Sequence, residues 1–319
     1  MQSSIFLVHE EPYCIWEVDI PERNNEFLDG IDTDFFNYIV ETNSNADDEK
    51  RASIALRSAL YHAMETMFSL LGAYIQAPDC TYAWIAKCSN SQLRDLVEKI
   101  KTPNNNIFTK LNIEEVSWDC VTKSVFQCYM PGTEKNETMV KEFSTFLNRT
   151  ATEFIKKNHI DEYNSLKHGF RVRSGGFSLS LGTMHEYGVS PPEEKMMSLG
   201  KSDYGTSFFT TEAIGKRKGN RSIRSRRASI NWSIENTILH LQLISMAIGN
   251  ITSALKVANG AKAGTCQFHR PQQDSDFQRP WSITTGISSC NMDYVIHEEE
   301  IITATKSEIL EKIGRVSKI

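Results

Sequence analysis

Residues 45–77 read NADDEKRASIALRSALYHAMETMFSLLGAYIQA and end directly before Pro78. Acidic side chains lead the segment and a proline follows it, which are signals for the start and the end of a helix. Between them, apolar residues recur at helical spacing, at Ile54, Leu56, Leu60, Met64, Met67, Phe68, Leu71 and Ile75. The second half is apolar nearly all round, so we expect a central helix surrounded by other elements.

The same periodicity predicts further helices, at about residues 90–101, 112–127, 134–157, 161–169, 229–258 and 303–316. The stretch from Thr237 to Leu255 has no Asp, Glu, Lys or Arg and is close to membrane-spanning length. It also contains His240, Gln242 and Asn250, which are costly in lipid. We therefore interpret it as a buried helix and expect no membrane partner.

Strand signals are shorter and more scattered. Runs of β-branched and aromatic residues before Pro21 predict one or two strands or an extended arm at the N-terminus. Residues 170–182, FRVRSGGFSLSLG, alternate around a Gly-Gly pair, which is typical of a β-hairpin. Residues 183–215 have no dominant period and indicate a long surface excursion. Short strands are expected at 266–270, 281–286 and 292–297.

Together these patterns predict a mainly α fold, a helical bundle with a β-hairpin and short peripheral strands. We expect one elongated domain over residues 1–319. Its parts are an acidic N-terminal arm (1–45), a helical bundle (46–168), a hairpin with a long basic loop (169–228), and a long helix with a mixed C-terminal segment (229–319).

Charge is distributed unevenly along the chain. The net charge is −5. The first fifty residues contain 13 acidic and two basic side chains. By contrast, residues 216–227, KRKGNRSIRSRR, contain seven basic side chains and no acidic one. Such a run could contact several phosphates of a nucleic acid, or pair with the acidic segment of the same or a second chain. The candidate nucleic-acid-binding residues are Lys167, Arg173, Lys216, Arg217, Lys218, Arg221, Arg224, Arg226 and Arg227.

The densest polar cluster closes the helix predicted at 161–169. Asn164 and His168 are four residues apart and share a helix face, with Lys167 beside them, while Arg171 and Arg173 alternate beyond. Histidine exchanges protons near neutral pH, and cations stabilise a phosphate. We take His168, Asn164 and Arg171 as candidate catalytic residues for a phosphodiester. Alternatively, Asn164 and His168 cap the helix.

The segment Asn164-Ser-Leu-Lys-His168 resembles the second half of the motif of the HEPN superfamily, which is Arg, a polar residue, a short spacer and His. Tyr163 stands where that family has its arginine. A separate Arg-x4-His pattern occurs as Arg57 to His62, inside the long helix. The resemblance implies a helical bundle that cleaves or binds RNA, in accessory or degenerate form because the catalytic arginine is absent.

Two helices carry His-x-x-Glu pairs, His62 with Glu65 and His159 with Glu162. This spacing places imidazole and carboxylate on one helix face, where they could share a metal ion. The order is the reverse of the Glu-x-x-His of di-metal bundles, which favours structural roles for all four residues.

The sequence as a whole predicts a cytoplasmic protein, because the first residues lack a secretory signal. We expect it to bind RNA or another polyanion, as an accessory or degenerate ribonuclease-like component of a defence or toxin system. The first alternative to RNA binding is a homo-oligomeric structural or interaction protein, such as a homodimer. The second alternative is a metal-binding helical bundle. No cofactor is expected, because the common nucleotide-binding and hydrolase motifs are absent.

Overall fold

The structure is a computed structural model that describes residues 2–184, 186–215, 222–297, 300 and 304–316. Its helices are α1 (Ile20–Asp29), α2 (Phe35–Ser44), α3 (Glu49–Gln76), α4 (Thr81–Lys87), α5 (Asn90–Ile100), α6 (Trp118–Val125), α7 (Glu134–Phe154), α8 (Lys157–Lys167), α9 (Ile234–Ala258) and α10 (Lys306–Val316). Its strands are β1 (Gln2–Val8), β2 (Glu11–Glu17), β3 (Val172–Ser174), β4 (Ser178–Leu181), β5 (Met197–Lys201), β6 (Gly205–Ile214), β7 (Ser222–Asn231) and β8 (Ser289–His297).

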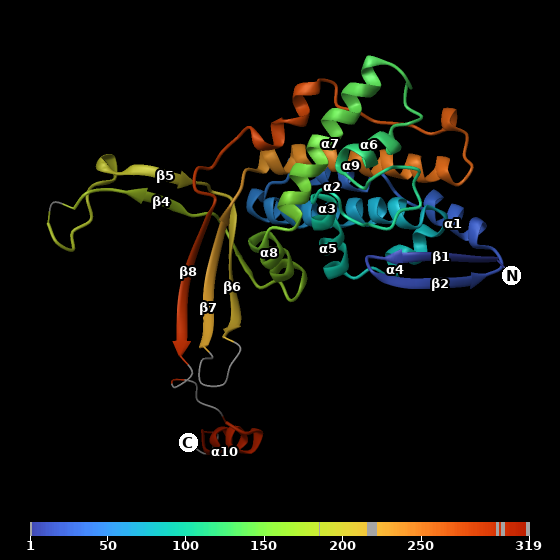
Figure 1. Ribbon diagram of the computed structural model, residues 1–319. Coiled ribbons are helices and arrows are strands. Elements are labelled where there is room, and N and C mark those ends of the chain that lie inside the picture. The colour runs from blue at the N-terminus through green and yellow to red at the C-terminus, as the bar shows by residue number, and fades with distance from the viewer. Residues whose placement is uncertain (1, 185, 216–221, 298–299, 301–303, 317–319) are drawn as a thin grey trace.

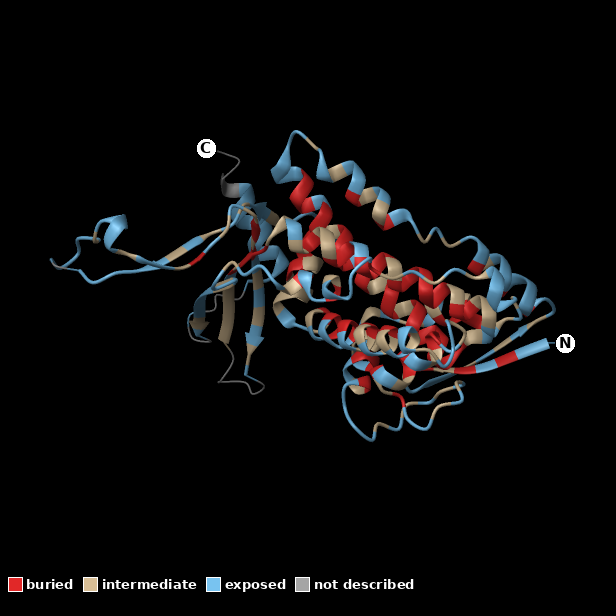
Figure 2. Cartoon of the chain, turned by 90° about the horizontal axis from the view of Figure 1, so that it is seen from above, coloured by how far each residue is buried: buried red, intermediate tan, exposed pale blue. Residues whose placement is uncertain are grey.

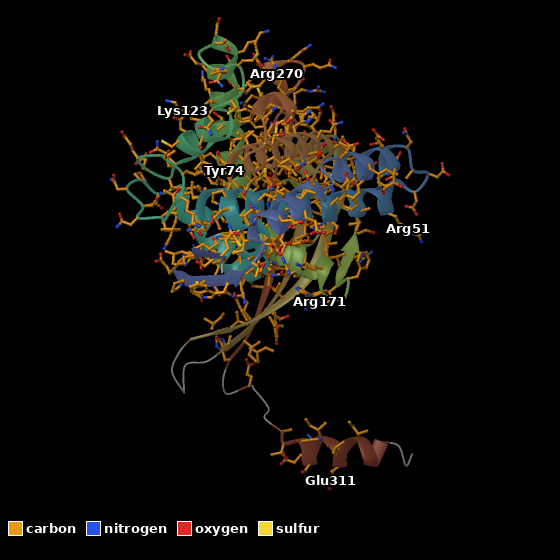
Figure 3. All side chains as sticks on the ribbon, turned by 90° about the vertical axis from the view of Figure 1, so that its right-hand side faces the viewer. Arg51, Tyr74, Lys123, Arg171, Arg270 and Glu311 are labelled. Carbon is orange, nitrogen blue, oxygen red and sulfur yellow. The ribbon has the colours of Figure 1, made fainter. Side chains whose placement is uncertain are left out.

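Helix α3 is the central helix, as its sequence predicts. The side chain of Asp48 accepts a hydrogen bond from the backbone N–H of Arg51 at 3.0 Å, which caps the first turn, and the helix ends before Pro78. Helix α3 packs along α9, with other helices around the pair (Figure 1). Figure 2 shows that the buried residues are concentrated in this bundle, and the labelled Tyr74 lies within it in Figure 3.

Helix α9 begins five residues later than the sequence suggests, because residues 222–231 belong to strand β7 and Ser233 provides the cap. The Ser233 side chain accepts a hydrogen bond from the N–H of Asn236 at 3.3 Å. By length and composition α9 is a candidate membrane span, but 72% of its apolar window is buried inside the protein. The apolar side chains of α9 therefore pack against neighbouring helices such as α2 and α3.

The prediction of a mainly helical bundle is wrong. Of the residues that the structure describes, 52% are helical and 19% are in strands, which is a mixed α+β fold. A four-stranded antiparallel sheet has the order β3-β6-β7-β8, and β1 with β2 and β4 with β5 form two-stranded sheets. The expected surface excursion contains β5 and β6, and the described part of the expected basic loop is β7.

The physical reason is the position of the four-stranded sheet. The base of the sheet packs on the bundle through Thr206, Phe208, Ala228 and Ile230, whereas its far half extends beyond the helices (Figure 1). Strands with water on both faces need no alternation of apolar and polar residues. Because this alternation is the main sequence signal for a strand, such strands are hard to predict. Their pairing is also between distant residues, as in Phe209 opposite Arg227.

The hairpin expected around Gly175-Gly176 does not form. Strand β3, before the glycines, pairs with β6, while β4, after them, pairs with β5. Gly175 has φ +112°, and a Cβ on Gly176 would lie 2.2 Å from the carbonyl oxygen of Ser202. The two glycines therefore allow the chain to pass closely by Ser202 as it leaves one sheet and enters the other.

The N-terminal segment forms the two predicted strands rather than an extended arm. Strands β1 and β2 form an antiparallel pair, and α1 and α2 follow them onto the bundle. Phe6, Val8, Leu28, Phe36 and Val40 are buried in the main core. The acidic residues of this segment lie on the outer side of these elements, where Asp29, for example, pairs with Lys256 at 2.8 Å.

Near the C-terminus, only the strand expected at 292–297 forms, as part of β8. The segment expected as a strand at 266–270 is irregular, and the one at 281–286 forms no strand, although Gly286 makes an isolated β-bridge with Gly200.

Candidate nucleic-acid interface

The cluster predicted as catalytic lies where α8 ends and the chain turns into β3. The backbone N–H of His168 donates to the carbonyl of Asn164 at 3.0 Å, and that of Arg171 donates to the carbonyl of Ser165 at 2.7 Å. Arg171 also donates its Nε–H to the His168 carbonyl at 2.9 Å. His168 and Arg171 are exposed, and Asn164 is half-buried. These contacts close the end of a helix at the protein surface, where Figure 3 labels Arg171.

The four-stranded sheet sorts the predicted arginines onto two faces. Side chains of directly paired residues in an antiparallel sheet lie on the same face, and successive residues alternate. Arg224 and Arg226 therefore share one face with Glu212 and Asp293, which we call the paired face. Arg173 and Arg227 lie on the other face, which we call the open face; its other members include Ser207, Phe209, Thr211, Ser225, Met292 and Tyr294.

Acidic neighbours neutralise the arginines of the paired face. Arg224 donates from Nη1 to Glu212 at 2.9 Å, and Arg226 makes two bonds to Asp293, at 2.6 and 2.8 Å. The hydrogen bond from Arg226 lowers the pKa of the Asp293 carboxyl, so the pair stays ionised. These two arginines therefore pair within the sheet rather than with the acidic N-terminal segment.

The open face combines free cations with exposed aromatic rings. Within the described strands none of its residues is acidic, and neither Arg173 nor Arg227 forms an ion pair with any described residue. Phe209, directly opposite Arg227, is 68% exposed, and Tyr294, two residues along from Met292, is 66% exposed. Sequence reasoning missed both rings, because only the strand pairing places them beside the arginines.

The remaining basic residues differ in their surroundings. Lys167 is exposed, with its Nζ 3.6 Å from Glu65, so part of its charge is compensated. Lys216, Arg217, Lys218 and Arg221 lie outside the described residues. By sequence they stand between the far ends of β6 and β7.

The two His-x-x-Glu pairs do not meet. His62 is exposed with its ring 5.5 Å from that of Phe36, and Glu65 accepts a hydrogen bond from Tyr163 at 2.9 Å. His159 lines a cavity on another side of α3, and Glu162 is fully buried. No group of three or more metal-ligating side chains was found in the described part of the chain. The four residues therefore do not assemble into a metal site.

Glu162 belongs to a buried polar network that the sequence pattern did not reveal. It accepts hydrogen bonds from Arg57, at 3.2 and 3.0 Å, from Tyr61, and from Thr206 at 2.5 Å. Burial alone would lower the pKa of Arg57, but the Glu162 carboxylate raises it above the ordinary arginine value. Burial raises the pKa of Tyr61, which stays a neutral donor. The network joins α3, α8 and β6, and so fixes the sheet on the bundle.

The two residues of the Arg-x4-His pattern, Arg57 and His62, therefore lie on different sides of α3. Arg57 is committed to Glu162 inside the protein, whereas His62 lies on the outer side of α3. Neither lies at the helix end that holds Asn164 and His168.

Comparisons with known proteins found no matching family model, no matching curated protein and no matching solved structure.

Proposed function

We propose that this protein binds single-stranded RNA on the open face of its four-stranded sheet. The observation that carries the proposal is the placement of Arg173 and Arg227, without acidic partners, on the same face as the exposed rings of Phe209 and Tyr294. Arginines of this kind contact phosphates, and exposed rings stack on unpaired bases. A single strand fits better than a duplex, whose bases are already stacked on one another.

The sheet geometry suits this ligand. Neighbouring strands lie about 4.8 Å apart, and residues on one face of a strand are separated by about 7 Å. Phe209 and Arg227 are direct cross-strand neighbours, so a base on the ring would bring its phosphate near a guanidinium.

Two double variants with equal loss of charge test the proposal. Arg173→Gln with Arg227→Gln removes two cations from the open face, and Arg224→Gln with Arg226→Gln removes two from the paired face. Anisotropy of a labelled oligouridine, followed from about 50 to 200 mM salt, measures affinity and its salt dependence. We expect only the open-face variant to bind more weakly, with a salt slope smaller in magnitude by about 1.4.

Stacking gives the second readout of the same experiment. Phe209→Ala and Tyr294→Ala should each weaken binding by roughly 5- to 150-fold, because base stacking contributes about 1–3 kcal/mol. No binding at low salt, or equal losses in the two charge variants, would refute the proposal. Incubation of the same RNA with wild type and His168→Ala tests the ribonuclease interpretation, which requires cleavage that the variant loses.

Self-association is a second candidate function, favoured by the apolar surface of the β4–β5 arm. This arm projects from the body in Figure 1, and several of its apolar side chains are exposed: Leu181, Met184, Tyr187, Val189 and Met197. Tyr187 near its tip is 99% exposed. A cluster of this kind is more typical of a protein interface than of free surface.

Light scattering checks this second candidate. We expect an oligomer at both low and high salt, because the contact would be apolar. Tyr187→Ser with Leu181→Ser should shift it to the monomer, whereas Tyr38→Ser, which removes an exposed ring on α2, should not. If the protein were a monomer at every accessible concentration, self-association through this arm would be excluded.

A further inference from the structure

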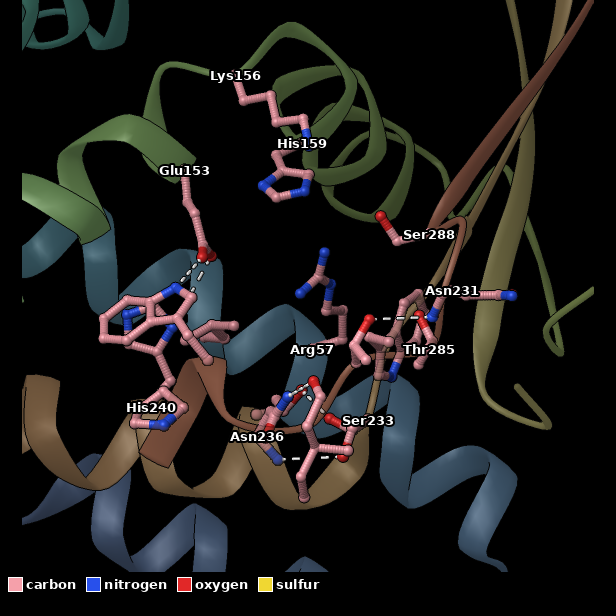
Figure 4. Close-up of a pocket in the computed structure, with 18 residues that line it drawn as sticks. Arg57, Glu153, Lys156, His159, Asn231, Ser233, Asn236, His240, Thr285 and Ser288 are labelled. Carbon is pink, nitrogen blue, oxygen red and sulfur yellow. Dashed lines mark hydrogen bonds and ion pairs between the residues drawn. The ribbon is translucent and has the colours of Figure 1, made fainter. Parts of the chain in front are cut away.

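A separate polar cavity lies between the bundle and the base of the sheet (Figure 4). Its volume is about 300 Å³, and its walls come from α3, the junction of α7 and α8, the first turn of α9 and the segment before β8. That volume would hold roughly ten waters and reaches the range of small-ligand sites. Ile283, Thr284 and Ser288 at its rim are exposed, so the cavity is accessible.

Unused hydrogen-bonding atoms are concentrated here. Eight buried side-chain polar atoms have no hydrogen-bond partner among the described residues. Three of them belong to residues that line this cavity: His159 Nδ1, Trp232 Nε1 and Asn236 Oδ1. Trp232 is itself buried. Buried polar atoms normally have partners, so water or a polar ligand must complete these three.

Positive groups converge on one side of the cavity. Arg57, only 5% exposed, uses Nε and Nη2 for Glu162, and its Nη1 has no hydrogen bond to a described residue. Lys156 has no ion pair among the described residues, and Figure 4 shows it beside His159 above the Arg57 guanidinium. Below them, Ser233, Asn236 and Thr237 present the N-terminal turn of α9, which carries partial positive charge.

This arrangement favours a tetrahedral anion over a planar one. Glu162 Oε2 accepts from both Nε and Nη2 of Arg57, so this side of the guanidinium is occupied and its remaining N–H groups lie at the Nη1 end. The donors that remain are the Nη1 end of Arg57, the Lys156 ammonium, and the imidazole and helix turn from other directions. Donors from several sides match the oxygens of a phosphate group.

The opposite wall offers an acceptor. Glu153 accepts a hydrogen bond from Trp281 Nε1, and its carboxylate is 3.9 Å from Nδ1 of the buried His240. A second anion would be repelled there, whereas a ligand hydroxyl could donate to Glu153. We propose that this cavity binds a small phosphomonoester that also carries hydroxyl groups, with its phosphate between Arg57, Lys156 and His159.

Isothermal titration of the full chain with inorganic phosphate, ribose 5-phosphate and malonate tests this proposal. Ribose 5-phosphate should bind most tightly and malonate most weakly. Lys156→Gln should weaken ribose 5-phosphate about tenfold, because a charged hydrogen bond is lost. The matched control is Lys157→Gln: Lys157 is the next residue along, and its ammonium pairs with Asp161 at 2.8 Å, so affinity should not change.

His159→Gln should also weaken both phosphate probes, and Glu153→Gln should reduce the preference for ribose 5-phosphate over inorganic phosphate. Absence of binding by either phosphate probe, equal effects of Lys156→Gln and Lys157→Gln, or malonate binding as tight as phosphate would each overturn the proposal. The open-face variant with Arg173→Gln and Arg227→Gln should keep full affinity for ribose 5-phosphate, which separates this site from the proposed RNA surface.

Discussion

Glu162→Ala is expected to destabilise the protein by about 3–5 kcal/mol, the usual cost of removing one partner from a buried ion pair. The carboxylate is 0% exposed and accepts from Arg57, Tyr61 and Thr206. Its removal leaves the Arg57 charge buried without its counter-ion and two hydroxyl groups without their acceptor. The free energy of unfolding, from urea titration followed by circular dichroism, measures the loss.

Asp161→Ala is the matched control for this variant. Asp161 is the preceding residue of α8, and it pairs with Lys157 one helical turn away, where the lysine is largely exposed. A surface pair of this kind contributes less than about 1 kcal/mol. If Glu162→Ala and Asp161→Ala had equal effects, the buried network would not be what attaches the sheet to the bundle.

The second large effect concerns pH. His240 is buried, with its Nε2 2.9 Å from Thr150 Oγ1, and burial lowers its pKa below the ordinary value. Burial also lowers the pKa of His159 well below that value, and Arg57 and Lys156 lower it further. Both imidazoles therefore stay neutral in the folded chain at a pH where the unfolded chain already binds protons.

The sign of the pH dependence follows from this difference. Above about pH 6.5 neither state protonates these histidines, and stability is at its full value. As the pH falls below 6.5, the unfolded state takes up protons that the folded state does not. Stability should then decrease by up to about 1.4 kcal/mol per pH unit for each histidine, until the pH reaches the folded-state pKa.

Urea titrations between pH 7 and 5, in phosphate-free buffer, measure this loss. The double variant His159→Gln with His240→Gln should show a flatter dependence of unfolding free energy on pH than the wild type, whatever its stability at pH 7. Identical slopes in the two proteins would show that other groups cause the acid sensitivity. Added phosphate should stabilise the wild type if the cavity binds it.

The proposed RNA surface and the proposed phosphate cavity rest on different parts of the chain. The open face is formed by β3, β6, β7 and β8, whereas the cavity draws mainly on α3, the junction of α7 and α8, α9 and residues 280–288. Glu162 lies between them, because it holds both Arg57 at the cavity wall and Thr206 in the sheet. Damage to this network should therefore affect both sites, while surface variants should affect one.

The sequence by itself determined the helices with strong local signals. Asp48 and Pro78 bound α3 as expected, and the apolar residues between them form the centre of the core. Helices α5, α7 and α9 also lie close to their expected ranges. Helical periodicity and capping depend on residues a few positions apart, so they can be read from one segment without its neighbours.

Only the tertiary structure decided the sheet and both candidate sites. Arg224, Arg226 and Arg227 look alike in the sequence, but the register of β7 against β6 and β8 pairs the first two with acids and places Arg227 beside Phe209. Arg57 and Glu162 are 105 positions apart. Contacts of this kind are set by how distant segments pair and pack, which no local pattern of residues encodes.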